Sequence, residues 1–187
     1  MRIVVSGTHA SGKSTLIADF ARRHPEYLVL ADPFELIDES DDRPAAAMFA
    51  SQLRIAAGRL IEGESGENLI AERGPLDFLA YLLALDELGR TVLDRSTLSS
   101  AADRTRTALA TVDHLVVLPL TAAHPIHVGD DEDAALRETM NDVLLDLLDD
   151  SDVIPAGLTV TEVTGSPAER LARIETLIAE PRSSERG

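Results

Sequence analysis

Lysine occurs once in this 187-residue sequence, at Lys13, and all the other lysine-or-arginine positions are arginine. Lys13 lies in the segment Gly7-Thr8-His9-Ala10-Ser11-Gly12-Lys13-Ser14, which matches the G-x-x-x-x-G-K-[ST] phosphate-binding loop. A compact ammonium group on a flexible stem suits a triphosphate, and a forked guanidinium is a poor substitute. The motif therefore predicts a nucleotide-binding site.

The flanking sequence supplies the strand and the helix that such a loop requires. Residues 2–6 read as a short buried strand, and residues 14–21 read as an amphipathic helix. We expect the loop backbone, at Gly7, His9, Ala10, Ser11 and Gly12, to surround phosphate at the helix N-terminus. Lys13 would contact the β- and γ-phosphates, Ser14 would bind Mg²⁺, and Thr15 would lie near the α-phosphate.

A second signal is the segment Asn68-Leu69-Ile70-Ala71-Glu72-Arg73-Gly74-Pro75, an apolar strand followed by an acid and an arginine. An acid at the carboxyl end of a parallel strand faces the crevice where α/β sheets bind ligands. Glu72 could hold Mg²⁺ through water or accept a proton, and Arg73 could clamp a substrate or the transferred phosphate. The alternative is an ordinary surface pair.

A third acid, Asp32, ends the apolar run 27–31 and precedes Pro33. Because proline terminates the strand, Asp32 is expected at the mouth of the sheet, where it could orient or deprotonate an attacking hydroxyl. The alternative is an aspartate that simply begins a turn before the proline.

Composition narrows the possible partners and compartments. The formal net charge of −16 provides no basic stripe for nucleic acid and disfavours anionic membrane surfaces. The absence of cysteine excludes a disulfide framework, and no apolar stretch is long enough to span a membrane. Met1-Arg2 leads directly into the first strand without a signal-peptide core, so we expect a cytoplasmic protein.

Strand and helix patterns alternate along the chain. Further strands are expected at 27–31, 68–71, 112–118 and 158–163, with helices at about 43–62, 75–88, 95–110, 135–149 and 167–180. This alternation predicts a three-layer α/β/α fold around a five-stranded parallel sheet. We expect one domain at 1–180, a lid at about 121–137 and a flexible tail at 181–187.

The expected helix at 75–88 is apolar on every face. Such a helix is either wedged between the sheet and neighbouring helices or part of a homodimer interface.

Together these segments resemble the P-loop kinases of nucleosides and nucleotides, within the P-loop NTPase superfamily. The resemblance rests on the loop, Asp32-Pro33, Glu72 to Asp77 and Gly165 to Arg170, and it spans the chain in order and spacing. The Gly-Thr-His start and the Gly-Pro-Leu-Asp run are more similar to the small ATPase and kinase domains related to the ribosylnicotinamide kinases.

This resemblance implies a strand order of 2-3-1-4-5 and several further roles. It places a base-reading glutamine at Gln52, for which an exposed helical glutamine is the alternative. It implies that Ser166 and Pro167, in the turn after the last strand, contact adenine, mostly through backbone. It also implies that Arg137 neutralises the transferred phosphate together with Arg73.

The leading functional hypothesis is a Mg-ATP-dependent kinase that phosphorylates a small molecule, a nucleoside or nucleotide. Catalysis would involve Lys13, Asp32, Glu72, Arg73 and Arg137, with ATP and Mg²⁺ as cofactors. The alternative is an ATP-binding regulatory protein or weak ATPase that signals to a protein partner. Two features motivate it: the acidic run at 130–133, which would repel a polyphosphate, and the expected helix at 75–88, which is apolar on every face.

The sequence also bears on a metal site and on a GTPase function. His124 and His127 could bind a metal, but a solvated lid is favoured, because no cysteine accompanies them and no helix fixes the geometry of the two rings. A GTPase is disfavoured because the Asn-Lys-x-Asp guanine reader needs a second lysine.

Overall fold

The computed structural model describes residues 1–33, 46–63, 68–121 and 133–179. It contains a five-stranded sheet in the order β2-β3-β1-β4-β5, and all four neighbouring pairs are parallel. The strands are β1 (Arg2–Ser6), β2 (Leu28–Leu30), β3 (Leu69–Glu72), β4 (His114–Val117) and β5 (Thr159–Glu162). The predicted fold class and strand order are confirmed.

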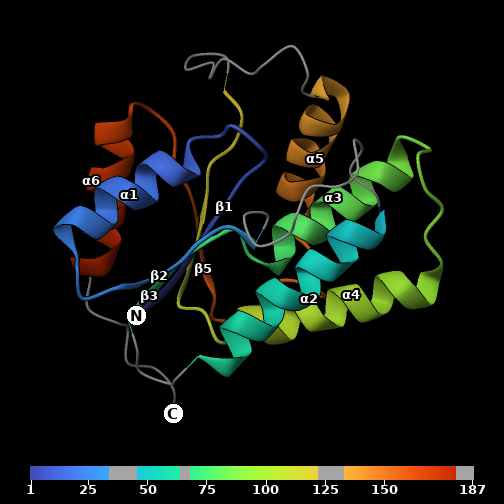
Figure 1. Ribbon diagram of the computed structural model, residues 1–187, viewed down its shortest axis with the longest axis horizontal. Coiled ribbons are helices and arrows are strands. Elements are labelled where there is room, and N and C mark those ends of the chain that lie inside the picture. Colours follow the sequence, from blue (N-terminus) through green and yellow to red (C-terminus); the bar gives the residue numbers. More distant parts are fainter. Residues whose placement is uncertain (34–45, 64–67, 122–132, 180–187) are drawn as a thin grey trace.

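Helices cover both faces of the sheet, as Figure 1 shows. On one face lie α1 (Lys13–Arg23) and α6 (Pro167–Ala179). On the other lie α2 (Ala46–Glu62), α3 (Pro75–Glu87), α4 (Arg95–Leu109) and α5 (Ala134–Leu147). None of the helices in the described ranges is long and apolar enough to cross a bilayer.

The central strand divides the apolar core into two clusters. Ile3 and Val5 of β1 pack with apolar residues of α1 and α6. Val4, between them, packs with α2 to α5. This alternation is what a strand with successive side chains on opposite faces produces, and it explains why β1 is buried along its whole length.

The apolar helix α3 is internal. Almost every side chain from Pro75 to Leu85 is buried, and they pack in the cluster shared with α2, α4 and α5. A homodimer through this helix is not shown, and the burial of α3 among the described helices argues against it. The internal alternative explains its all-round apolar character.

Most of the predicted lid at about 121–137 lies outside the described residues, as does the tail at 181–187. Residues 134–137 form the first turn of α5 rather than part of a loop. The division into a domain at 1–180, a lid and a tail stays a prediction.

Asp133 caps α5, the helix that carries Arg137. Its carboxylate accepts a hydrogen bond from the Leu136 amide at 3.0 Å and forms an ion pair with Arg90, which follows α3. These bonds hold the pKa of Asp133 below its ordinary value, with the Arg90 bond the largest cause.

Replacing Asp133 with Ala should lower the free energy of unfolding by about 1 kcal/mol, the usual cost of losing a side-chain cap. Urea unfolding would measure this loss. Asp146→Ala, at an exposed position late in the same helix, is the matched control and should cause no loss. Equal stability of the Asp133→Ala variant and the unaltered protein would show that the cap contributes nothing.

Candidate functional site

The phosphate-binding loop connects β1 to α1 and depends on glycine at two positions. Gly7 has φ 153°, and a Cβ there would lie 2.6 Å from Ser11 Oγ and 2.8 Å from the Leu118 carbonyl oxygen. Gly12 has φ 91° and is the N-cap of α1. No other residue type adopts both conformations without strain, so the motif glycines are required by the loop geometry.

Lys13 is buried within this loop, with 4% of its surface exposed. Its Nζ donates to the carbonyl oxygens of Gly7 at 2.9 Å and Thr8 at 2.7 Å, and to Ser11 Oγ at 3.3 Å. Burial, followed by the positive charge of Arg73, lowers the pKa of Lys13 to about 7. In the ranges that the structure describes, the hydrogen bonds of Nζ go to neutral oxygens and not to a carboxylate. A buried ammonium in such surroundings is a site for an anion such as phosphate.

Two arginines from distant helices orient the loop peptides. Arg137 of α5 donates from Nε to the His9 carbonyl at 3.0 Å and from Nη2 to the Ala10 carbonyl at 3.4 Å. Arg170 of α6 donates from Nη1 to the Ser11 carbonyl at 2.7 Å. In a planar trans peptide the C=O and the following N–H point in opposite directions, so the amides of Ala10, Ser11 and Gly12 point away from these arginines. That arrangement suits amides that bind phosphate.

Ser14 and Glu72 meet at the carboxyl edge of the sheet. Ser14 Oγ donates to Glu72 Oε1 at 2.6 Å. A hydroxyl and a carboxylate are hard oxygen donors of the kind that Mg²⁺ prefers, so these residues fit the predicted metal. In the described part of the chain there is no group of three or more His, Asp or Glu that could hold a metal.

Arg73 connects the loop to Asp32. Its Nε donates to Asp32 Oδ2 at 2.6 Å, and its Nη1 donates to the Gly7 carbonyl at 3.3 Å. Burial alone lowers the pKa of Arg73, but Tyr81 and Asp32 outweigh it and hold this pKa above the ordinary arginine value. Glu72-Arg73 is thus not a surface pair, since both side chains are buried.

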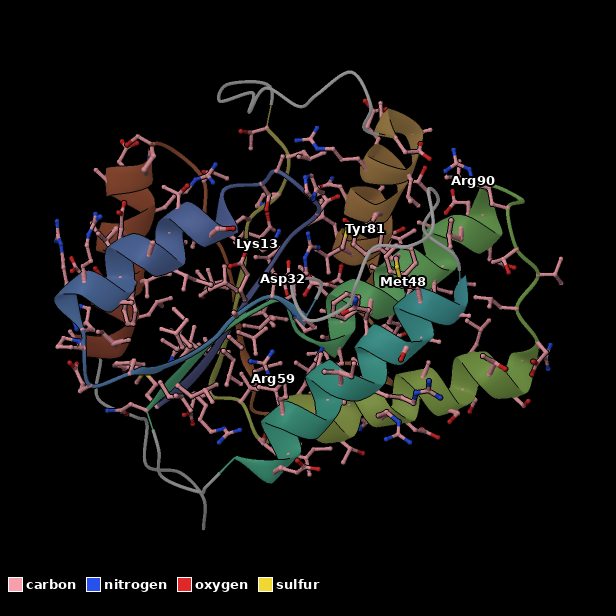
Figure 2. The ribbon with its side chains drawn as sticks, viewed as in Figure 1. Lys13, Asp32, Met48, Arg59, Tyr81 and Arg90 are labelled. Carbon is pink, nitrogen blue, oxygen red and sulfur yellow. The ribbon has the colours of Figure 1, made fainter. Side chains whose placement is uncertain are left out.

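The backbone around this pair is also specialised. Arg73 has φ 60°, a left-handed conformation that costs a non-glycine residue about 1 kcal/mol or more. Arg59 of α2 donates to the Ala31 carbonyl at 2.7 Å and so steadies the chain next to Asp32. Figure 2 shows Lys13 and Asp32 in the region between α1 and α2.

Asp77 is a residue of this site to which the sequence analysis assigned no role. Its carboxylate is fully buried and accepts three hydrogen bonds. The donors are Ser6 Oγ at 2.7 Å, the Gly7 amide at 2.8 Å and the Gly74 amide at 2.9 Å. Asp77 therefore fastens the start of the phosphate loop to the turn that carries Arg73. An aspartate in the first turn of an otherwise apolar helix was the available signal.

Tyr81, one turn further along α3, was also missed. Its hydroxyl accepts from the His9 amide at 3.0 Å and lies 3.5 Å from Arg73 Nη1. Its ring stacks on Phe49 of α2 with 4.6 Å between the centroids. Nothing local distinguishes this tyrosine from the surrounding core residues, so only the packing of α3 against the loop reveals it.

Gln52 is fully buried on α2, so the exposed-glutamine alternative is wrong. Neither Oε1 nor Nε2 of its amide has a hydrogen-bond partner among the described residues. A buried amide without partners is costly unless a ligand supplies them.

Of the remaining predicted residues, Thr15, Ser166 and Pro167 lie within the described ranges, and the two histidines do not. Thr15 is exposed on α1, next to the exposed Ser14, while Ser166 hydrogen-bonds Glu169 Oε2 through its amide at 2.8 Å and its hydroxyl at 2.7 Å. Pro167 begins α6 beside it. His124 and His127 lie outside the described residues. The ligand contacts predicted for Thr15, Ser166 and Pro167 stay predictions.

Solved structures with a similar fold include a deoxyadenosine kinase and a thymidylate kinase. A deoxyadenosine kinase from M. mycoides with bound dATP matches with a TM-score of 0.68 and 15% identity over 96% of this chain and 100% of that chain. A thymidylate kinase from Candida albicans matches with a TM-score of 0.59 and 16% identity over 94% and 89% of the two chains. No curated protein matches the sequence.

The sheet order, the phosphate loop and these similarities define a P-loop protein with the nucleoside-kinase-like fold. A family model described as an AAA domain matches residues 2–170. The chain belongs to this AAA domain family.

Proposed function

We propose that this protein is a Mg-ATP-dependent phosphotransferase whose acceptor is a small molecule, a nucleoside or nucleotide. One observation carries the proposal: the Arg73 guanidinium contacts both Asp32, at 2.6 Å, and the Gly7 carbonyl of the phosphate loop, at 3.3 Å. A group for the acceptor and a group for the donor phosphate are thereby held next to each other. A protein that only binds nucleotide has no need of this arrangement.

The residues divide the reaction between them. Lys13 and the loop amides hold the phosphates of ATP, and bound Mg²⁺ would offset the charge of its phosphate oxygens. Asp32 accepts the proton of the acceptor hydroxyl while the oxygen of that hydroxyl forms a bond to the γ-phosphorus. The bond between that phosphorus and the β,γ-bridging oxygen breaks, and ADP leaves. Arg73 and Arg137 stabilise the charge on the transferred group.

The acceptor class is supported by Gln52. Its amide can donate one hydrogen bond and accept another in the same plane, as the edge of a nucleobase requires. The amide is buried, and no described residue forms a hydrogen bond with it. The similar M. mycoides enzyme is a deoxyadenosine kinase, and one of its structures holds dCMP as a product. A nucleoside or nucleotide acceptor accounts for both observations.

The proposed role of Asp32 predicts that Asp32→Asn lowers kcat by about 100-fold, the typical contribution of a general base. Asparagine can still accept the Arg73 hydrogen bond, so the KM for ATP should change little. Steady-state kinetics with Mg-ATP across a panel of nucleosides and nucleotides would measure both constants.

Asp19→Asn is a suitable control, because Asp19 lies on α1 and pairs with the exposed Arg22. This variant should keep the activity of the unaltered protein. If the unaltered protein transferred phosphate to no member of the panel, the kinase proposal would fail.

Two sequence features suggested the alternative, an ATP-binding regulator or weak ATPase. The apolar helix no longer supports it, because α3 is buried within the chain. The acidic run ending at Asp133 remains. The ratio of phosphorylated acceptor to free phosphate distinguishes the two: stoichiometric acceptor phosphorylation excludes the regulator, and hydrolysis alone supports it.

A further inference from the structure

Arg170 contacts two separate parts of the nucleotide site. It lies in the first turn of α6 with 6% of its surface exposed. Its Nη1 donates to the Ser11 carbonyl of the phosphate loop at 2.7 Å, and its Nε donates to the Gly165 carbonyl at 2.9 Å. One planar guanidinium thus joins the loop to the turn at 164–166.

The hydrogen bond to Ser11 fixes the orientation of the Ser11-Gly12 peptide. Because its C=O points at Arg170, its N–H points to the opposite side, where the phosphate loop receives its ligand. Arg170 therefore acts on the Gly12 amide without contacting phosphate itself.

Glu169 also holds the turn at 164–166, through hydrogen bonds with Ser166. Glu169 accepts from both the amide and the hydroxyl of Ser166. Gly165 has φ 99°, and a Cβ there would lie 2.8 Å from Glu169 Oε2. The turn is therefore held between Glu169 and Arg170, and its distance from the loop is set by the Arg170 side chain.

The charge of Arg170 has no carboxylate partner in the described part of the chain. Its hydrogen bonds go to two neutral carbonyl groups, and burial lowers its pKa. A buried guanidinium without a counter-charge favours an anion nearby, which a bound polyphosphate would supply.

The position of the turn indicates which part of the ligand it faces. Parallel strands end at the same edge of a sheet, so the turn after β5 lies at the same edge as the loop after β1, with β4 between these strands. Asp32 and Arg73 follow β2 and β3, on the opposite side of β1. The residues proposed for the acceptor therefore lie on one side of the loop. We expect the nucleoside part of the donor to bind on the other side, next to α6.

We propose that Arg170 is a positioning residue that sets the spacing between the phosphate loop and the 164–166 turn, and so makes the site prefer a nucleoside triphosphate over bare triphosphate. This inference rests on the nucleotide-binding part of the proposed function.

The test compares Mg²⁺ complexes of ATP and inorganic tripolyphosphate by isothermal titration calorimetry. In Arg170→Lys the charge remains, but an ammonium does not present the planar fork that spans the two carbonyls. The preference for ATP over tripolyphosphate should fall about tenfold, within the usual range for coupled contacts. Arg173→Lys, at an exposed position on the same helix, is the matched control and should keep the preference.

A second measurement needs only the unaltered protein. Tripolyphosphate has no base, yet it should shift the NMR amide signals of both Gly12 and Ser166, because Arg170 connects them. The signal of Gly157, which precedes β5, should not move. An unchanged Ser166 signal would overturn the inference even if Arg170→Lys failed to fold.

The outcomes separate this inference from the kinase proposal. An unchanged ATP preference in folded Arg170→Lys overturns the positioning role and leaves the kinase proposal intact. A reduced preference in a protein that phosphorylates no acceptor supports the positioning role and overturns the kinase. A protein that does not bind ATP overturns both.

Discussion

Lys13→Ala should abolish the stabilisation of this protein by Mg-ATP. The unaltered protein should gain about 2.7 kcal/mol when ATP is present at 100 times its Kd. The variant loses the only side-chain ammonium of the loop, whose three hydrogen-bond acceptors all belong to the loop itself. Phosphoryl transfer should fall on the order of 1,000-fold or more, because the same group would stabilise the charge that develops during transfer. Thermal unfolding with and without ATP, together with an initial-rate assay, would measure the two effects.

Without nucleotide, the free energy of unfolding of Lys13→Ala should be close to that of the unaltered protein. The variant loses the hydrogen bonds of Nζ, but it also loses the desolvation penalty of the buried charge. Arg22→Ala is the control: Arg22 lies on the same helix, and 76% of its side-chain surface is exposed. It should keep the full ATP response. An undiminished ATP response in Lys13→Ala would mean that nucleotide binds elsewhere.

Asp77→Asn should lower the free energy of unfolding by about 3 kcal/mol, although the change is nearly isosteric. One carboxylate oxygen of Asp77 accepts from the Gly7 amide, and the other accepts from Ser6 Oγ and the Gly74 amide. An asparagine NH₂ group in either place would face an N–H donor, so neither orientation of the amide satisfies the site. Asp77→Ala should cost more, because it leaves all three donors without an acceptor.

Urea unfolding would measure the loss in both Asp77 variants. Glu87→Gln, at an exposed position near the end of the same helix, should change stability by less than about 0.5 kcal/mol. Because Asp77 holds the Gly7 amide, the asparagine variant should also bind ATP more weakly under conditions where it is folded. A stability equal to that of the unaltered protein would show that the three hydrogen bonds have no net value.

The sequence predicted the fold well because the relevant signals are local. β1 and β3 are short, largely apolar runs that end at polar residues, Ser6 and Glu72, and a parallel sheet brings the carboxyl ends of its strands to one edge. Asp32, Glu72 and Arg73 could therefore be assigned to the crevice without knowledge of how the helices pack. The phosphate loop could be predicted from a single segment, because its glycines, Lys13 and Ser14 lie within eight consecutive residues and Lys13 contacts the backbone of that same segment.

The role of α3 could not be decided in this way. A helix that is apolar on all faces is compatible with burial inside one chain and with burial between two. The three helices α2, α4 and α5, which cover it, come from segments before and after it in the sequence. Only their packing distinguishes the two cases.

The sequence by itself predicted a phosphate-binding site at Lys13, within a parallel α/β sheet whose strand ends carry acids and an arginine. The tertiary structure alone decided how that loop is held: by Asp77 and Tyr81 from α3, by Arg137 from α5 and by Arg170 from α6. The physical reason is distance along the chain. Ser11 and Arg170 are 159 residues apart, and no periodicity or short motif records which donor will meet which carbonyl across such a separation. Such contacts are a property of the packed helices and appear only when the chain has folded.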